Sequence, residues 1–142
     1  MTDPAHPGRM LFVNMPVADI ERSKAFFAKL GFTFNPHFTN EQATCMIVSE
    51  EAFVMLLVES FFQTFTKKPI ADARQSTEVL VCLSCASRAE VDALVQKALA
   101  AGGTVPRAAQ DHGFMYGHGF EDPDGHVWEL VWMDPNAAPP HA

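Results

Sequence analysis

One carboxylate interrupts an otherwise apolar stretch near the end of the chain. Glu129 lies within VWELVWM, in which all the remaining side chains are apolar. Gly117 and Gly119 lie on the preceding segment and would leave space in front of it. A carboxylate that breaks a hydrophobic pattern in this way can serve as a general base or as a hydrogen-bonding anchor for a ligand. The alternative is that Glu129 has no chemical role and is solvated by water.

The surroundings of Glu129 depend on the turn that precedes it, DPDG over residues 122–125. Proline pre-sets the first turn position and glycine takes a positive φ, which favours a three-residue loop closed by a glycine bulge. That loop places Gly119 opposite Glu129. A two-residue loop would place His118 opposite Glu129 instead, which would look like half of a metal site. The turn residues fit the three-residue loop, so we favour it.

Side chains alternate along a strand, so the residues around Glu129 divide between two faces. Trp128, Leu130 and Trp132 share one face and form a predicted core. Glu129 shares the other face with its two valine neighbours, Val127 and Val131. The sequence therefore predicts a carboxylate that points away from the core.

Few other residues could bind a metal. The weak candidates beside Glu129 are His118 and His112. Cys82 and Cys85 lie three residues apart in a predicted strand, so they point to opposite faces about 10 Å apart, beyond the reach of a disulfide. Reduced thiols are typical of a cytoplasmic protein.

The composition is that of a globular domain with a sizeable core. The chain has 142 residues, 48% of them hydrophobic, and a formal net charge of −7. The negative charge argues against a nucleic-acid or anionic-membrane partner. No apolar run approaches the roughly 20 residues that a membrane span requires. The sequence therefore predicts neither a nucleic-acid nor a membrane partner.

The first half of the chain predicts a β-α-β-β-β unit. Asp19 caps a helix over residues 20–30 that ends at Gly31. The apolar stripe of this helix contains Ile20, Phe27 and Leu30. The predicted strands cover residues 10–17, 32–38, 43–49 and 53–58.

The second half repeats the pattern. A capping box that begins at Ser87 opens a helix that ends near Gly102. An edge strand is expected over residues 104–108, limited by Pro106. The other expected strands cover residues 77–85 and the two arms of the final hairpin. The predicted organisation is a first module over residues 10–58, a linker over 59–76, a second module over 77–134 and flexible termini at 1–9 and 135–142.

Two stretches carry a resemblance to a known family: VNMPVADIERSKAFFAKLGFTF (residues 13–34) and FEDPDGHVWELVWMD (residues 120–134). With the tandem β-α-β-β-β order between them, the chain resembles the glyoxalase/bleomycin resistance protein/dioxygenase family of the vicinal oxygen chelate superfamily. The resemblance implies an α+β fold, in which two modules form an eight-stranded curved sheet or half-barrel with helices outside. It also implies a homodimer and a cleft that holds one divalent ion in the metal-dependent members.

The family's metal ligands carry over to this sequence only in part. The ligand in the closing strand falls on Glu129, whereas the other three positions fall on Phe12, Leu56 and Leu80. None of these three side chains can bind a metal. The resemblance thus implies, as the alternative to a functional Glu129, that this residue is the relic of a lost metal site. A catalytic site for nickel, zinc, manganese or iron needs about three protein ligands, and the matched positions supply one.

Two functions from different classes follow. The first is metal-free small-molecule binding in an apolar cleft around Glu129. The ligand-binding residues expected for it are Phe12, Asn14, Leu56, Leu80, Cys82, Met115 and Glu129. The alternative is a divalent-metal-dependent lyase, lactoylglutathione-lyase-like, that recruits His118 or His112 beside Glu129. An enzyme without metal would use Glu129 as its catalytic acid or base.

Overall fold

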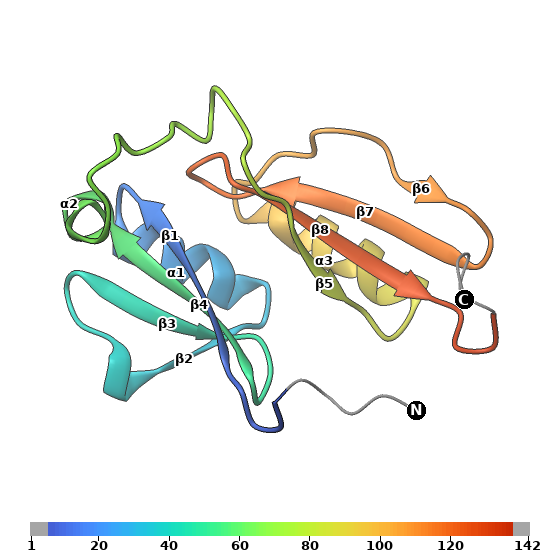
Figure 1. Cartoon of the computed structure of the whole chain (residues 1–142). Helices are drawn as coiled ribbons and strands as arrows, with labels where there is room; N and C mark the ends of the chain where they lie inside the picture. The colour runs from blue at the N-terminus through green and yellow to red at the C-terminus, as the bar shows by residue number, and fades with distance from the viewer. Residues whose placement is uncertain (1–5, 138–142) are drawn as a thin grey trace. The chain divides into compact units, whose positions relative to one another are not determined.

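The computed structural model describes residues 6–137 of the chain (Figure 1). The chain divides into two compact units, Met1–Ile70 and Ala71–Ala142. The division falls inside the segment expected to be a linker, 59–76. The expected flexible termini at 1–9 and 135–142 lie partly outside the described residues.

Unit 1 contains a four-stranded sheet with one long helix. Its elements are β1 (Leu11–Val17), α1 (Ile20–Lys29), β2 (Thr33–Asn35), the 3-10 turn η1 (Pro36–Phe38), β3 (Ala43–Ile47), β4 (Ala52–Val58), the short helix α2 (Glu59–Phe62) and the turn η2 (Gln63–Phe65). The strand order is β1-β4-β3-β2. β1 and β4 run parallel and the other pairs are antiparallel.

Helix α1 forms where the sequence predicts it. The Asp19 side chain accepts a hydrogen bond from the Arg22 backbone N–H at 3.1 Å. At the other end Gly31 adopts φ 103°, the left-handed conformation that ends many helices. Ile20, Phe27 and Leu30 are buried, as the stripe predicts.

Unit 2 repeats the topology of unit 1. Its elements are β5 (Val81–Ser84), α3 (Arg88–Ala100), β6 (Gln110–Asp111), β7 (Met115–Glu121) and β8 (Val127–Met133). The strand order is β5-β8-β7-β6, again with the first and last strands parallel. Ser87 caps α3 by accepting from the Glu90 N–H at 3.0 Å, while the Glu90 carboxylate accepts from the Ala86 N–H at 2.7 Å. This is the predicted capping box with its return bond displaced by one residue.

The predicted edge strand over 104–108 is wrong. Thr104 makes an isolated antiparallel bridge to Glu121, and regular pairing resumes only at β6, Gln110–Asp111. Pro106 has no N–H to give to the ladder, which interrupts the pairing between these two points. Three further strands are clearly shorter than predicted. β2 ends at Asn35 because residues 36–38 form the turn η1, β3 ends at Ile47, and β5 covers only 81–84.

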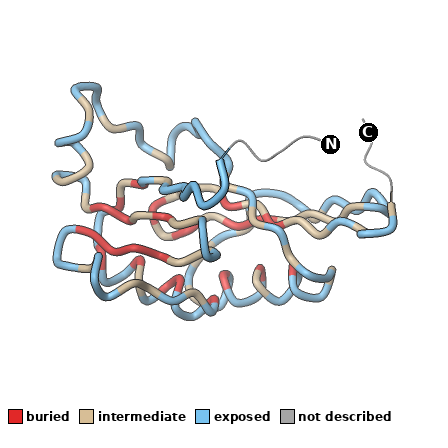
Figure 2. The backbone as a smooth tube through the Cα atoms, turned by 60° about the horizontal axis from the view of Figure 1, so that its bottom comes forward, coloured by how far each residue is buried: buried red, intermediate tan, exposed pale blue. Residues whose placement is uncertain are grey.

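The α+β class and the tandem β-α-β-β-β order are confirmed. The eight strands divide into two four-stranded sheets, one in each unit. In each unit the buried residues follow the strands and the helix side that faces them (Figure 2). One face of each sheet therefore packs on a helix.

Candidate functional site

The final hairpin has the register expected from its turn. Gly125 adopts φ 91° and its N–H donates to the Asp122 carbonyl at 2.9 Å. Gly119 lies opposite Glu129, and His118 lies opposite Leu130. The two-residue loop, which would have put His118 opposite Glu129, is therefore wrong.

A buried carboxylate holds this turn together. Asp122 is 5% exposed, and its Oδ1 accepts from the backbone N–H groups of Asp124 and His126 at 2.9 and 3.1 Å. Its Oδ2 accepts from the Trp128 indole N–H at 3.0 Å. Burial raises the pKa of Asp122, while the His126 charge and the three N–H donors act in the opposite direction. The sequence showed Asp122 only as a turn residue, so its link to Trp128 was missed.

The two faces of the unit 2 sheet differ in chemistry. Trp128 and Leu130 are at most 1% exposed, on the side where α3 packs against β7 and β8. Glu129 lies on the opposite side, here called the Glu129 face. Across this face Cys82 on β5 and Gly119 on β7 lie in register with Glu129 on β8. Glu129 is thus the central residue of a row that crosses three strands.

Two other expected ligand-binding residues also belong to unit 2. Met115 is paired with Met133 at the far end of β7, an even number of residues from Gly119 and hence on the Glu129 face. Leu80 is 54% exposed and directly precedes β5, two residues before Cys82. Cys82 is an exposed residue, but partial desolvation of its thiol and the nearby Glu129 charge both raise its pKa. A raised pKa makes Cys82 a poor nucleophile near neutral pH.

Gly119 is in close contact with the Glu129 side chain. A Cβ at position 119 would lie 2.9 Å from Glu129 Oε2 and 2.5 Å from the Trp128 carbonyl oxygen. The Glu129 carboxylate therefore occupies the space that the glycine leaves. Gly117 is under less constraint, since a Cβ there would meet its nearest atom, the Leu130 carbonyl oxygen, at an ordinary 3.6 Å.

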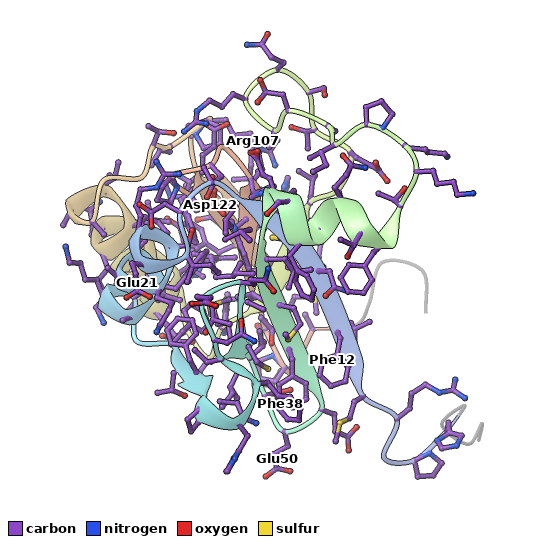
Figure 3. The ribbon with its side chains drawn as sticks, turned by 90° about the vertical axis from the view of Figure 1, so that its left-hand side faces the viewer. Phe12, Glu21, Phe38, Glu50, Arg107 and Asp122 are labelled. Carbon is purple, nitrogen blue, oxygen red and sulfur yellow. The ribbon has the colours of Figure 1, made fainter. Side chains whose placement is uncertain are left out.

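Arg107 is the charged partner of Glu129 and was not predicted. Its Nη2 lies 3.6 Å from Glu129 Oε1, and the two side chains are 63% and 24% exposed. Arg107 belongs to the segment between Thr104 and β6, and Figure 3 labels it. His118 Nε2 lies 3.2 Å from the Arg107 carbonyl oxygen and donates to it, since a carbonyl can only accept. His118, expected as a weak metal ligand, is instead bonded to the backbone of Arg107.

In unit 1 the expected residues divide between the two sheet faces. Phe12, labelled in Figure 3, is 48% exposed. Its ring stacks on Phe53, with ring centroids 5.0 Å apart and 16° between the planes. Asn14 is exposed, lies two residues further along the same face and is paired with Met55. We call this surface the Phe12 face.

The expected placement of Leu56 beside Phe12 is wrong. Phe12 is paired with Phe53, and Leu56 lies three residues beyond Phe53, which turns its side chain to the opposite face. Leu56 is 0% exposed and belongs to the core of unit 1. Met55, the partner of Asn14, takes the position on the Phe12 face that was expected for Leu56.

Comparison with known proteins agrees with this architecture. Residues 9–49 match a family described as bleomycin resistance protein-like N-terminal. Hypothetical protein SA1046 from S. aureus is 29% identical, with a TM-score of 0.74 over 87% of this chain and 91% of that one. A glyoxalase/bleomycin resistance protein/dioxygenase family enzyme from Burkholderia phytofirmans PsJN is 19% identical, with a TM-score of 0.72 over 86% and 96% of the two chains. The chain has the glyoxalase/bleomycin resistance fold. No curated protein matches its sequence.

Activity within this fold cannot be transferred from its neighbours. A lactoylglutathione lyase from Agrobacterium tumefaciens is also similar, at 17% identity and a TM-score of 0.66 over 89% of this chain and 95% of that one. At that identity the likeness concerns the glyoxalase/bleomycin resistance fold alone, and one fold hosts many functions. The function must therefore be inferred from the residues at the site.

A divalent metal does not fit the residues that the glyoxalase/bleomycin resistance fold presents here. Within residues 6–137, no three His, Cys, Asp or Glu side chains are grouped so that they could hold a metal ion. Glu129 is paired with Arg107, and the matched positions Phe12, Leu56 and Leu80 carry no donor atom.

Within residues 6–137, no helix is long and apolar enough to cross a membrane.

Proposed function

We propose that this protein binds a small organic molecule on the Glu129 face of its second unit, without a metal. The observation that supports the proposal is the setting of Glu129, a half-buried carboxylate held against Gly119 and paired with Arg107 at 3.6 Å. Val127, Val131 and Met115 supply apolar surface on the same face. A few polar groups within apolar surface are the usual composition of an organic ligand site.

A metal-dependent lyase would need ligands that Glu129 does not have near it. His118 is bonded to Arg107 through Nε2, and His112 is exposed in the turn after β6. The guanidinium of Arg107 would also repel a divalent cation bound at Glu129. The arrangement therefore favours direct binding of an organic ligand over the lyase.

The proposal is tested by screening planar and apolar metabolites and drugs by thermal shift, with affinities measured by calorimetry. Glu129→Gln keeps the shape of the side chain but removes its charge, and should weaken a ligand that donates to the carboxylate by about tenfold or more. Glu78→Gln is a matched control, because Glu78 is exposed and lies outside the strands of unit 2. A ligand bound equally by the wild type and Glu129→Gln would contradict the proposed role of Glu129. No thermal shift across the whole panel would count against binding itself.

Metal content tests the metal-free part of the proposal. Untagged protein is incubated with nickel, zinc, manganese or ferrous iron, desalted and analysed by mass spectrometry. We expect far less than one metal per chain for each ion. About one metal per chain that is lost in Glu129→Ala would contradict the proposal and support the lyase.

A homodimeric, cytoplasmic state stays a prediction from the family resemblance and the reduced cysteines. Light scattering coupled to gel filtration would measure the dimer. A monomeric mass at the concentration of the binding assays would exclude a site that requires two copies.

A further inference from the structure

Arg107 lies on a segment whose backbone is fixed on both sides. Before it, Thr104 is bridged to Glu121 through two backbone hydrogen bonds of 3.2 and 2.8 Å and a side-chain bond of 2.7 Å. After it, β6 pairs with β7, and His118 holds the Arg107 carbonyl itself. The segment thus keeps the Arg107 backbone beside β7, while the side chain reaches Glu129 on β8.

The ion pair between Arg107 and Glu129 contributes little to folding. Its separation of 3.6 Å exceeds a direct hydrogen bond, and the Arg107 side chain is 63% exposed. Exposed pairs of this kind often contribute nothing measurable to stability. A segment that fixes the Arg107 backbone is therefore poorly explained by stability alone.

The two carboxylate oxygens of Glu129 have different neighbours. Oε2 lies on the Gly119 side, whereas Oε1 is the oxygen nearer to Arg107. At 3.6 Å, Arg107 Nη2 and Glu129 Oε1 are too far apart for a direct hydrogen bond. A ligand hydroxyl or primary amide could accept a hydrogen bond from the guanidinium and donate one to Oε1 at the same time. The pair thus offers a donor and an acceptor side by side.

We propose that Arg107 is the specificity-determining residue of the Glu129 site, and that the site takes a neutral ligand whose hydroxyl or amide bridges Arg107 and Glu129. This inference rests on the proposed function and adds the class of ligand to it. The charges of the pair cancel, so a cation that approaches Glu129 meets the repulsion of Arg107. An anion that approaches Arg107 meets the repulsion of Glu129. Specificity here arises from rejection of charged competitors as much as from attraction.

The test uses three probes with one ring system: 2-naphthol, 2-naphthylmethylammonium and 2-naphthoate. Affinities are measured by calorimetry for the wild type, Arg107→Gln and the control Lys97→Gln. Lys97 is an exposed residue in the last turn of α3, so its replacement makes the same charge change away from the Glu129 face. Thermal denaturation should show both variants folded like the wild type.

We expect the wild type and Lys97→Gln to bind naphthol more tightly than either charged probe. In Arg107→Gln the ratio of ammonium to naphthol affinity should rise by on the order of tenfold, because the carboxylate is no longer neutralised, and tenfold corresponds to about 1.4 kcal/mol. Glu129→Gln should remove the gain when it is combined with Arg107→Gln.

The outcomes separate the inference from the function on which it rests. Probe binding with the same affinity ratio in the wild type and Arg107→Gln overturns the role of Arg107 and leaves ligand binding intact. A wild type that prefers the ammonium probe overturns the proposed ligand class. Failure of all three probes to bind the wild type and Arg107→Gln overturns the inference and counts against an aromatic-ligand site on this face.

Discussion

Unit 1 and unit 2 build the same sheet, in the orders β1-β4-β3-β2 and β5-β8-β7-β6, and each pairs its first strand in parallel with its last. On the Phe12 face, Phe12 and Phe53 stack. Asn14 lies there in a row with Met55, Cys45 and Asn35, none of which is charged. On the Glu129 face, a carboxylate lies between a thiol and a glycine and is paired with an arginine.

In each unit, one face of the sheet provides the packing with the helix, and the opposite face can carry the chemistry. The helix-packed faces are buried in both units, because each helix must cover an apolar surface. The opposite face is less completely covered. In unit 1 it buries Cys45 and Leu57 but leaves Phe12 exposed. In unit 2 it leaves Cys82 exposed, so this face can diverge. In this chain we assign the ligand chemistry to unit 2, because its open face carries the charged pair of Glu129 and Arg107.

The largest effect should come from Leu56→Ala. Leu56 is 0% exposed in the core of unit 1, and removal of a fully buried leucine side chain costs about 3–4 kcal/mol. Met55→Ala, on the Phe12 face, should cost less than half as much. The free energy of unfolding of unit 1 can be measured by hydrogen exchange of β3 and β4. Equal losses in the two variants would contradict the assignment of faces.

Asp122→Ala should destabilise unit 2 by about 3 kcal/mol, because it leaves the buried Trp128 N–H and two turn N–H groups without their acceptor. The corresponding turn of unit 1 has no buried carboxylate, and Ser49 there accepts one N–H at 3.4 Å. Ser49→Ala should therefore change little. Both tryptophans lie on β8, so denaturation followed by tryptophan fluorescence reports on unit 2. A loss below about 1 kcal/mol in Asp122→Ala would show that the network is dispensable.

Cys85, which directly follows β5 in unit 2, allows a test of thiol reactivity. Burial and the nearby Glu90 raise the pKa of Cys85 from 9.0 to about 11. At pH 8 its thiolate fraction should be about 100-fold lower than that of an unperturbed thiol, and its alkylation rate should rise about tenfold per pH unit up to about pH 11. The raised pKa also favours the folded state below pH 9, a contribution that is lost as the pH rises through about 11. Mass spectrometry of alkylated peptides measures the rate, and a plateau near pH 9 would contradict the raised pKa.

The smallest change in stability should come from Gly119→Ala, with Gly117→Ala as its control. A Cβ at Gly119 would lie 2.5 Å from a backbone oxygen, so this variant should lose about 1–2 kcal/mol and displace the Glu129 carboxylate. Gly117→Ala makes ordinary contacts and should change stability by less than about 0.5 kcal/mol. Fluorescence-detected denaturation compares them. Equal stabilities would show that β7 can shift to relieve the contact.

The features that the sequence predicted correctly, the ends of α1 and the register of the final hairpin, are set by short-range interactions. Asp19, Gly31 and the turn at residues 122–125 defined the α1 boundaries and the hairpin register, and the register in turn placed Glu129 opposite Gly119. The error at Leu56 arose because its position was carried over from the family resemblance, and alternation along the strand does not say which face is buried. Its true side required the parallel pairing with β1, a long-range contact.

The missing partners of the site were long-range as well. Arg107 lies 22 residues before Glu129 in a segment without periodicity, and nothing in its local sequence indicates an ion pair. Asp122 could be recognised as a turn residue, but its bond to Trp128 depends on the indole side chain folding back over the turn. Thr104 alone remained of the predicted edge strand, because Pro106 interrupts the backbone pairing.

The parallel pairing of first and last strands also has a consequence for biosynthesis. In both units the strand made first lies at the edge of its sheet, beside the strand made last. On the ribosome, β1 emerges with its apolar side chains, including Leu11 and Phe12, before β4 has been translated. The nascent chain therefore exposes an unpaired apolar strand for as long as the intervening residues take to be made. Chaperone binding to a stalled nascent chain should weaken once β4 has left the exit tunnel, and then rise again as β5 appears without β8.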